Sequence, residues 1–122
     1  MKITKINNNG VEIAIVQSKD LIITDVQSAL DLIATINYEV RCNMFVINKE
    51  AIIEEFFKLS TGIAGEILQK FINYHIKFAV YGDFSVYTSK LLKGFICESN
   101  KGNSIYFSST QEEAVDGLFK AK

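Results

Sequence analysis

The sequence contains no proline, two cysteines and one histidine among its 122 residues. It also lacks any repeat or low-complexity linker, so nothing marks a domain boundary, and this length is usual for one domain. We therefore expect a single domain over residues 1–122. His75 has no cysteine or acid at metal-ligand spacing beside it, so we predict no metal site.

The chain also lacks an excess of charge of either sign and has no long apolar run. Its 13 Lys and Arg residues nearly balance its 14 Asp and Glu residues, which argues against a nucleic-acid partner. The longest apolar runs, "EIAIV" and "KFAVY", are strand-sized and far below the roughly 18 residues of a membrane span. The N-terminus "MKITKINNNG" has no apolar signal segment, so we expect the cytosol, where Cys42 and Cys97 stay reduced.

What the sequence does contain is an alternation of strand-like and helix-like segments. Asn9-Gly10 favours a tight hairpin between residues 2–7 and 11–17. Helical spacing of apolar residues then predicts helices over 25–37, 49–58, 62–73, 88–100 and 109–119, and short apolar runs predict strands over 42–48, 77–82 and 103–109. Possible capping boxes pair Thr24 with Gln27 and Ser109 with Glu112. Strands that alternate with helices predict an α/β fold: an N-terminal hairpin, then βα units forming a mainly parallel five-stranded sheet with packed helices.

In such sheets a ligand usually meets the loops at the carboxyl ends of the strands. Here those loops hold Ser18 and Asp20, then Asn48, the run Gly82-Asp83-Phe84-Ser85, and Ser108-Ser109. The third is the most suggestive as a ligand or partner loop, because a glycine that permits close approach precedes an acid and a hydroxyl. The alternative is structural: Asp83 or Ser85 caps the helix that follows, and Asn48 caps the helix predicted over 49–58.

The stretch "LSTGIAGEILQKF", residues 59–71, raises a similar question. Ser60, Thr61 and Gly62 stand where a phosphate or another anion could be held by the first free amides of the helix predicted to begin there. The alternative is that the hydroxyls only cap that helix. Gly65 inside the helix costs about 1 kcal/mol relative to alanine, and close packing of the helix would explain it.

Recognisable catalytic and cofactor motifs are missing. The sequence has no phosphate-loop or dinucleotide glycine fingerprint, no G-x-S-x-G, and no cysteine that stands out as a nucleophile. We therefore predict no cofactor and favour a non-catalytic role, with an enzyme as the third choice.

Two resemblances extend this interpretation. Residues 56–107 resemble the uncharacterised bacterial family catalogued as domain of unknown function 4180. The matching motifs are Gly62, Gly65-Glu66-Ile67-Leu68-Gln69-Lys70, Asn73-Tyr74, Gly82-Asp83-Phe84-Ser85, Ser89-Lys90 and Glu98-Ser99-Asn100. That family carries no established activity. The order of elements also resembles the STAS or SpoIIAA-like fold, which implies a serine or threonine phosphorylated at a helix start. Thr61 is the matching position, although Leu59 replaces the usual aspartate and the predicted helix 49–58 is extra.

Together these observations lead to two hypotheses. The first is a cytosolic, STAS-like regulatory domain that binds a protein partner near Ser60, Thr61 and the Gly82–Ser85 loop, switched by phosphorylation. The second is a domain that binds a small apolar ligand or lipid in a cleft lined by phenylalanines such as Phe56, Phe57 and Phe71. A homodimer is also possible, since a twofold-symmetric dimer is the commonest state among oligomeric soluble proteins.

Overall fold

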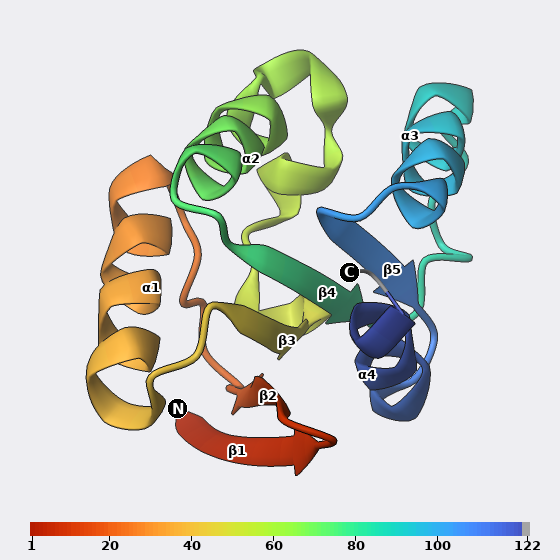
Figure 1. Cartoon of the computed structure of the whole chain (residues 1–122). Helices are drawn as coiled ribbons and strands as arrows, with labels where there is room; N and C mark the ends of the chain where they lie inside the picture. Colours follow the sequence, from red (N-terminus) through yellow and green to blue (C-terminus); the bar gives the residue numbers. More distant parts are fainter. Residues whose placement is uncertain (121–122) are drawn as a thin grey trace.

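A computed structural model of the chain describes residues 1–120 and begins with the expected hairpin (Figure 1). Strands β1 (Lys2–Asn8) and β2 (Val11–Gln17) pair antiparallel, with Ile6 opposite Ile13. Asn9 and Gly10 between them have φ angles of 55° and 85°. The hairpin prediction is confirmed, because these two residue types tolerate the left-handed backbone that a tight turn requires.

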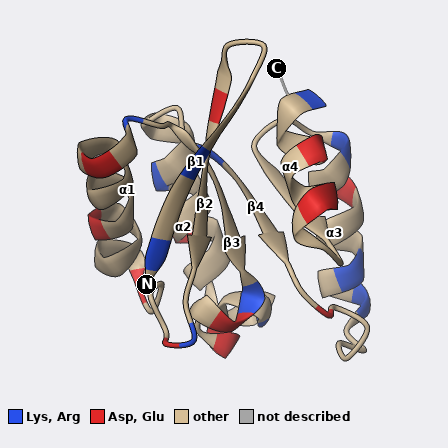
Figure 2. Ribbon diagram, turned by 90° about the horizontal axis from the view of Figure 1, so that it is seen from below, with Lys and Arg blue, Asp and Glu red and all other residues tan. Residues whose placement is uncertain are grey.

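The rest of the chain builds a mostly parallel sheet. Strands β3 (Met44–Asn48), β4 (Lys77–Tyr81) and β5 (Ile105–Ser108) follow β2 in parallel, and the strand order is β1-β2-β3-β4-β5. Figure 2 shows β1 to β4 side by side in this order. The α-helices within the described residues are α1 (Val26–Val40), α2 (Ile63–Asn73), α3 (Lys90–Lys101) and α4 (Gln111–Lys120). The chain therefore has the α/β class and the five-stranded sheet that the alternation predicted. The last two residues of the predicted domain, 121–122, lie outside the described residues.

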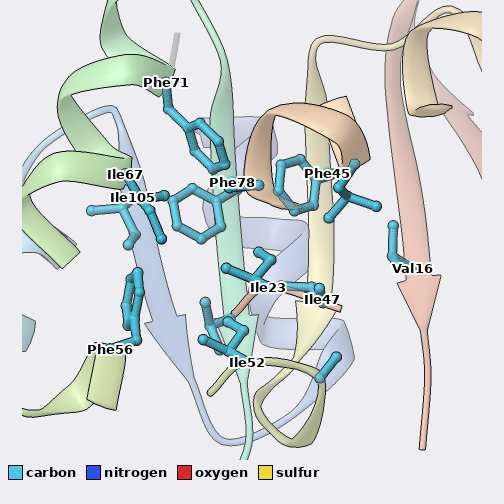
Figure 3. Close-up of a cluster of buried hydrophobic side chains, with 14 of the residues drawn as sticks. Val16, Ile23, Phe45, Ile47, Ile52, Phe56, Ile67, Phe71, Phe78 and Ile105 are labelled. Carbon is cyan, nitrogen blue, oxygen red and sulfur yellow. The ribbon is translucent and has the colours of Figure 1, made fainter. Parts of the chain in front are cut away.

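Helices cover the two faces of the sheet unequally. Each of α1, α2 and α3 connects a strand to the next parallel strand, and the three connections move across the sheet in the same direction. All three helices therefore pack on one face of the sheet (Figure 1). The larger core lies there, around the rings of Phe45, Phe71 and Phe78, whose centroids are 4.9–5.9 Å apart (Figure 3). Helix α4 follows the last strand and packs on the other face through Ala114 and Leu118.

The helix predicted over 49–58 is wrong. That segment instead forms two short 3-10 turns, η1 (Lys49–Ala51) and η2 (Glu54–Phe57), separated by an extended stretch. In that stretch Ile52 pairs with Ile23 in a parallel bridge, and the Ile53 N–H donates to the Ile23 carbonyl. Ile23 and Ile52 are both buried and lie side by side in the core (Figure 3). Tertiary pairing of these side chains overrides the local helical spacing.

Two helix starts lie one residue later than the predicted capping boxes. Asp25 caps α1 in a box with Ser28, in place of Thr24 with Gln27. At α4 the Glu113 N–H donates to the Thr110 hydroxyl, which donates back to the Glu113 carboxylate, in place of Ser109 with Glu112. In each case two adjacent residues both have side chains that can cap a helix. The sequence therefore located the start of the helix but not its exact first residue.

Candidate functional site

The loops at the carboxyl edge of the sheet are tied to one another by specific contacts. The Ser18 N–H donates to Asn48 Oδ1 at 3.0 Å, and Asn48 Nδ2 donates to the Ser18 carbonyl at 2.7 Å. Asn48 therefore joins the loop after β2 to the end of β3. It makes no capping bond to the turn after it, so its predicted role as a helix cap is wrong.

The loops after β3 and β4 meet at Gly82. A Cβ atom at Gly82 would lie 2.6 Å from the Cβ of Lys49, closer than side chains ever approach, so Lys49 occupies the space that the glycine leaves. The Lys49 ammonium then lies 4.8 Å from the centre of the Tyr87 ring, in a cation–π contact. The close approach at Gly82 thus brings a lysine of this chain against the following loop.

Beyond this contact the two loops enclose a surface hollow of about 400 Å³. One wall comes from η2 and the turn η3 (Leu59–Thr61), and the other from the segment before α3 and its first residues. Its lining residues are Glu54, Phe57, Lys58, Leu59, Ser60, Val86, Tyr87, Thr88, Ser89, Leu91 and Leu92, and we call it the η2–α3 hollow.

The η2–α3 hollow combines a buried apolar floor with an exposed apolar rim. Phe57 and Leu92 are buried, whereas Val86 and Leu91 are 62% and 77% exposed. Exposed aliphatic side chains beside a depression at the carboxyl edge of an α/β sheet are the kind of surface that binding sites use. This hollow is therefore the candidate site.

Tyr87 holds the two walls together. Its ring stacks on Phe57, with centroids 5.4 Å apart, and faces Phe84 at 6.4 Å. Its hydroxyl is buried and has no hydrogen-bond partner among residues 1–120. Burial, and then the neighbouring Glu54 and Glu50 carboxylates, raise the pKa of this phenol well above its ordinary value. Tyr87 therefore stays protonated, with its hydroxyl buried beside the Glu54 carboxylate.

Ser60 and Thr61 have different surroundings, and neither is the N-cap of α2. That position belongs to Gly62, whose φ of 79° suits glycine, and it makes no side-chain capping bond. The Thr61 hydroxyl lies 2.9 Å and 2.8 Å from the carbonyls of Glu55 and Lys58 and accepts the Ile63 N–H. Thr61 thus ties η2 and η3 to the start of α2. The Ser60 hydroxyl is exposed, lines the hollow and makes no hydrogen bond to a described residue.

Asp83 and Ser85 form a local turn. Both the N–H and the hydroxyl of Ser85 donate to Asp83 Oδ1, and these bonds lower the pKa of the Asp83 carboxyl, with a smaller contribution from Lys49. The alternative that one of them caps the next helix is wrong, because the Ser89 hydroxyl accepts the Leu92 N–H at the start of α3. Asp83 and Ser85 lie next to the hollow in sequence but do not line it.

Other features of the described chain offer less chemistry. A second hollow of about 460 Å³, between the end of α3 and α4, is lined mainly by polar side chains, and one of these, Asn100, already bonds the backbone of Phe107. Within residues 1–120 no three His, Cys, Asp or Glu side chains gather as metal ligands. No helix in that range combines the length and apolarity needed to cross a membrane.

The phenylalanines expected to line a ligand cleft mostly pack elsewhere. Phe56 and Phe71 are about 1% exposed and belong to the core, and Phe57 alone of the three contributes to the hollow. Sequence reasoning placed Ser60 and the Gly82–Ser85 loop in this region but missed Tyr87, Val86 and Leu91. One available signal was the pair Val86-Tyr87, apolar residues in a segment without helical or strand periodicity.

Comparison with known proteins identifies a family but no characterised relative. The family model described as "Domain of unknown function (DUF4180)" matches residues 8–118. No curated protein and no solved structure matches the chain.

Proposed function

Because the chain belongs to the DUF4180 family, whose description assigns no activity, we propose its role from geometry: it is a non-catalytic domain that binds a protein partner through the η2–α3 hollow. The observation that carries this proposal is the exposure of Val86 and Leu91 beside a buried apolar floor. Large exposed aliphatic side chains that flank a depression are typical anchors of protein interfaces.

The test is a comparison of surface variants in affinity capture from the host of the protein. The double variant Val86→Asp/Leu91→Asp should lose a partner that the wild type retains. Tyr38→Asp is the matched control, because Tyr38 is 87% exposed on α1, away from the hollow, and should retain the partner. Equal capture by both variants would contradict a contact at the hollow.

We further propose that Ser60, and not Thr61, is the residue that a kinase would modify. The Ser60 hydroxyl is free and borders the hollow, whereas a phosphate on Thr61 would require the loss of its bonds to the turn. A phosphate at Ser60 adds about two negative charges where a partner binds. Fragmentation mass spectrometry of protein from its own host should map a phosphate to Ser60; a phosphate on Thr61 would contradict the assignment.

We also propose that the fold is STAS-like and that the chain acts in regulation in a bacterial cytosol. The hairpin followed by βα units, and the hydroxyl of Ser60 in the turn that precedes α2, support that fold assignment. Ser60 lies one residue before Thr61, the position that the STAS resemblance implies. Subunit counting in the same mass spectra tests a homodimer.

The second candidate function is binding of a small apolar ligand. The volume of about 400 Å³ and the apolar floor favour it, since ligand pockets commonly begin at about 300 Å³. Native mass spectrometry should then show a non-covalent mass that disappears in Leu92→Asn. A spectrum without added mass favours the protein partner.

A further inference from the structure

Strand β5 forms one edge of the sheet, and no strand within residues 1–120 pairs with its outer side. Helix α3 packs beside it on one face and α4 on the other, and the hollow of about 460 Å³ lies between the end of α3 and α4 (Figure 1). The edge of a sheet presents unpaired N–H and C=O groups to any extended chain that approaches it. The outer side of β5 is therefore a place where a further strand could be added.

Only part of the β5 backbone faces this outer side. The carbonyls of Ser104 and Ser108 each accept, at 3.1 Å, an N–H from β4 or from the glycine that follows it. The backbone groups of successive residues in a strand point to opposite sides, so those of Ile105 and Phe107 point outward. Of the four residues of β5, these two alone could bond an added strand.

The side-chain amide of Asn100 already occupies one of these two positions. Asn100 lies in the last turn of α3, where its Nδ2 donates to the Phe107 carbonyl at 3.0 Å and its Oδ1 accepts the Phe107 N–H at 2.8 Å. A side-chain amide offers the same donor and acceptor as a peptide group. Asn100 therefore makes both bonds that one residue of a neighbouring strand would make. It leaves Ile105 as a single outward residue, which is too little for a stable strand pairing.

We propose that Asn100 blocks the β5 edge and prevents a second copy of this chain from adding its own β5 there. A second copy is the partner because the free edge is complementary to itself. In an antiparallel pair about a twofold axis, Ile105 of each copy lies opposite Phe107 of the other, so all the outward groups of both strands are bonded. This block is independent of the partner proposed for the η2–α3 hollow.

The experiment measures Asn100→Ala in the full-length chain by analytical ultracentrifugation and amide hydrogen exchange over a range of concentrations. At low concentration the Phe107 amide should exchange about tenfold or more faster than in the wild type, because its acceptor is gone. As the concentration rises, the variant should associate more strongly than the wild type, and the amides of Ile105 and Phe107 should become protected together. Circular dichroism verifies folding. If Asn100→Ala does not fold, Asn100→Ser replaces it, since a serine hydroxyl is too short to reach both Phe107 groups.

Asn100→Asp is the matched control. It keeps an acceptor for the Phe107 N–H but loses the bond to the Phe107 carbonyl, and an acid in the last turn of a helix is unfavourable. This variant is therefore destabilised as well. It should nevertheless associate no more than the wild type and keep the Phe107 amide protected, because a charge at a strand edge opposes pairing.

The proposal fails if Asn100→Ala has the subunit count of the wild type at every concentration, or if its Phe107 amide exchanges at the wild-type rate. Equal association of Asn100→Ala and Asn100→Asp would also overturn it, because general loss of stability would then be the cause. Association that leaves the Ile105 amide unprotected would place the contact elsewhere and overturn it too. None of these results bears on partner binding at the η2–α3 hollow, which Val86→Asp/Leu91→Asp tests.

Discussion

The Tyr87 phenol is an ionisable group that the hollow keeps in its neutral form. Its pKa is raised above the unfolded value of about 10, so the folded state holds this proton more tightly than the unfolded state does. The resulting stabilisation is complete below pH 10 and is lost as the pH rises toward the folded pKa. We expect wild-type stability to fall more steeply above pH 10 than that of Tyr87→Phe, measured by urea unfolding.

Two further comparisons support the Tyr87 measurement. At pH 7 Tyr87→Phe should be as stable as the wild type or about 1 kcal/mol more stable, because it removes a buried hydroxyl without a partner. Tyr38→Phe, which removes a phenol from an exposed site, is the matched control. Identical pH dependence in the wild type and Tyr87→Phe would show that the phenol is not shifted.

The adjacent hydroxyls of Ser60 and Thr61 should respond very differently to removal. Thr61→Val keeps the shape of the side chain but removes its bonds to Glu55, Lys58 and Ile63, so we expect a loss of about 1–2 kcal/mol in the free energy of unfolding. Ser60→Ala should change that energy by less than about 0.5 kcal/mol. Equal losses in urea unfolding would contradict the division of roles between a structural threonine and a free serine.

Residue-level roles were only partly readable from the sequence. Ser60 was identified as a candidate because a hydroxyl before a glycine and an apolar helix is a recognisable local pattern. Tyr87 was missed because its importance comes from Phe57 and Lys49, which belong to a loop after a different strand. Contacts between loops of neighbouring strands depend on the register of the sheet and leave no local pattern in the sequence.

At the scale of the helix, two glycines that look alike in sequence should behave in opposite ways. A Cβ at Gly117 in α4 would lie 2.4 Å from a ring carbon of Tyr106, whereas a Cβ at Gly65 in α2 would meet nothing within 4 Å. Gly117→Ala should therefore destabilise the protein by about 1–3 kcal/mol through overpacking. Gly65→Ala should stabilise it by up to about 1 kcal/mol through helix propensity.

Thermal unfolding of both glycine variants tests this pair. Gly117→Ala/Tyr106→Leu should recover much of the loss, because the ring that causes the clash is gone. A stabilising Gly117→Ala would refute the proposed clash. The open space at Gly65 also shows that close packing within this chain, the reason expected from the sequence, does not explain that glycine.

The elements that the sequence located best are those whose local signals agree with their environment. The Asn-Gly turn adopts the left-handed backbone that its residue types allow, and the apolar run of β4 is buried at three consecutive residues. The helical stripe of α2 matches its buried residues Ala64, Ile67 and Phe71. The segment 49–58 had the same helical spacing, but its isoleucines pair with the chain after β2, which cannot be inferred from the segment itself.

At the scale of the whole molecule, the two cores should unfold together as one domain. They share strands: Phe78 points into the larger core and its neighbour Ala79 into the smaller, and Phe45 and Val46 on β3 divide in the same way. Neither core can therefore lose its strands while the other keeps them. Helix α4 packs on β3, β4 and β5, and its buried residues Ala114 and Leu118 belong to the smaller core.

Ile67→Ala and Leu118→Ala test this cooperativity with matched truncations, one on each face of the sheet. Both side chains are at most 2% exposed, so each change should remove about 2–5 kcal/mol from a total that is typically 5–15 kcal/mol. In a single cooperative unit, urea midpoints from far-ultraviolet circular dichroism and from hydrogen exchange on either face should fall together in both variants. If Leu118→Ala lowered only the hydrogen-exchange protection of α4, that helix would unfold separately from the sheet. Residues 1–120 would then not behave as one domain. Coincident midpoints are the result we expect, because adjacent residues of β3 and β4 commit the same backbone to both cores.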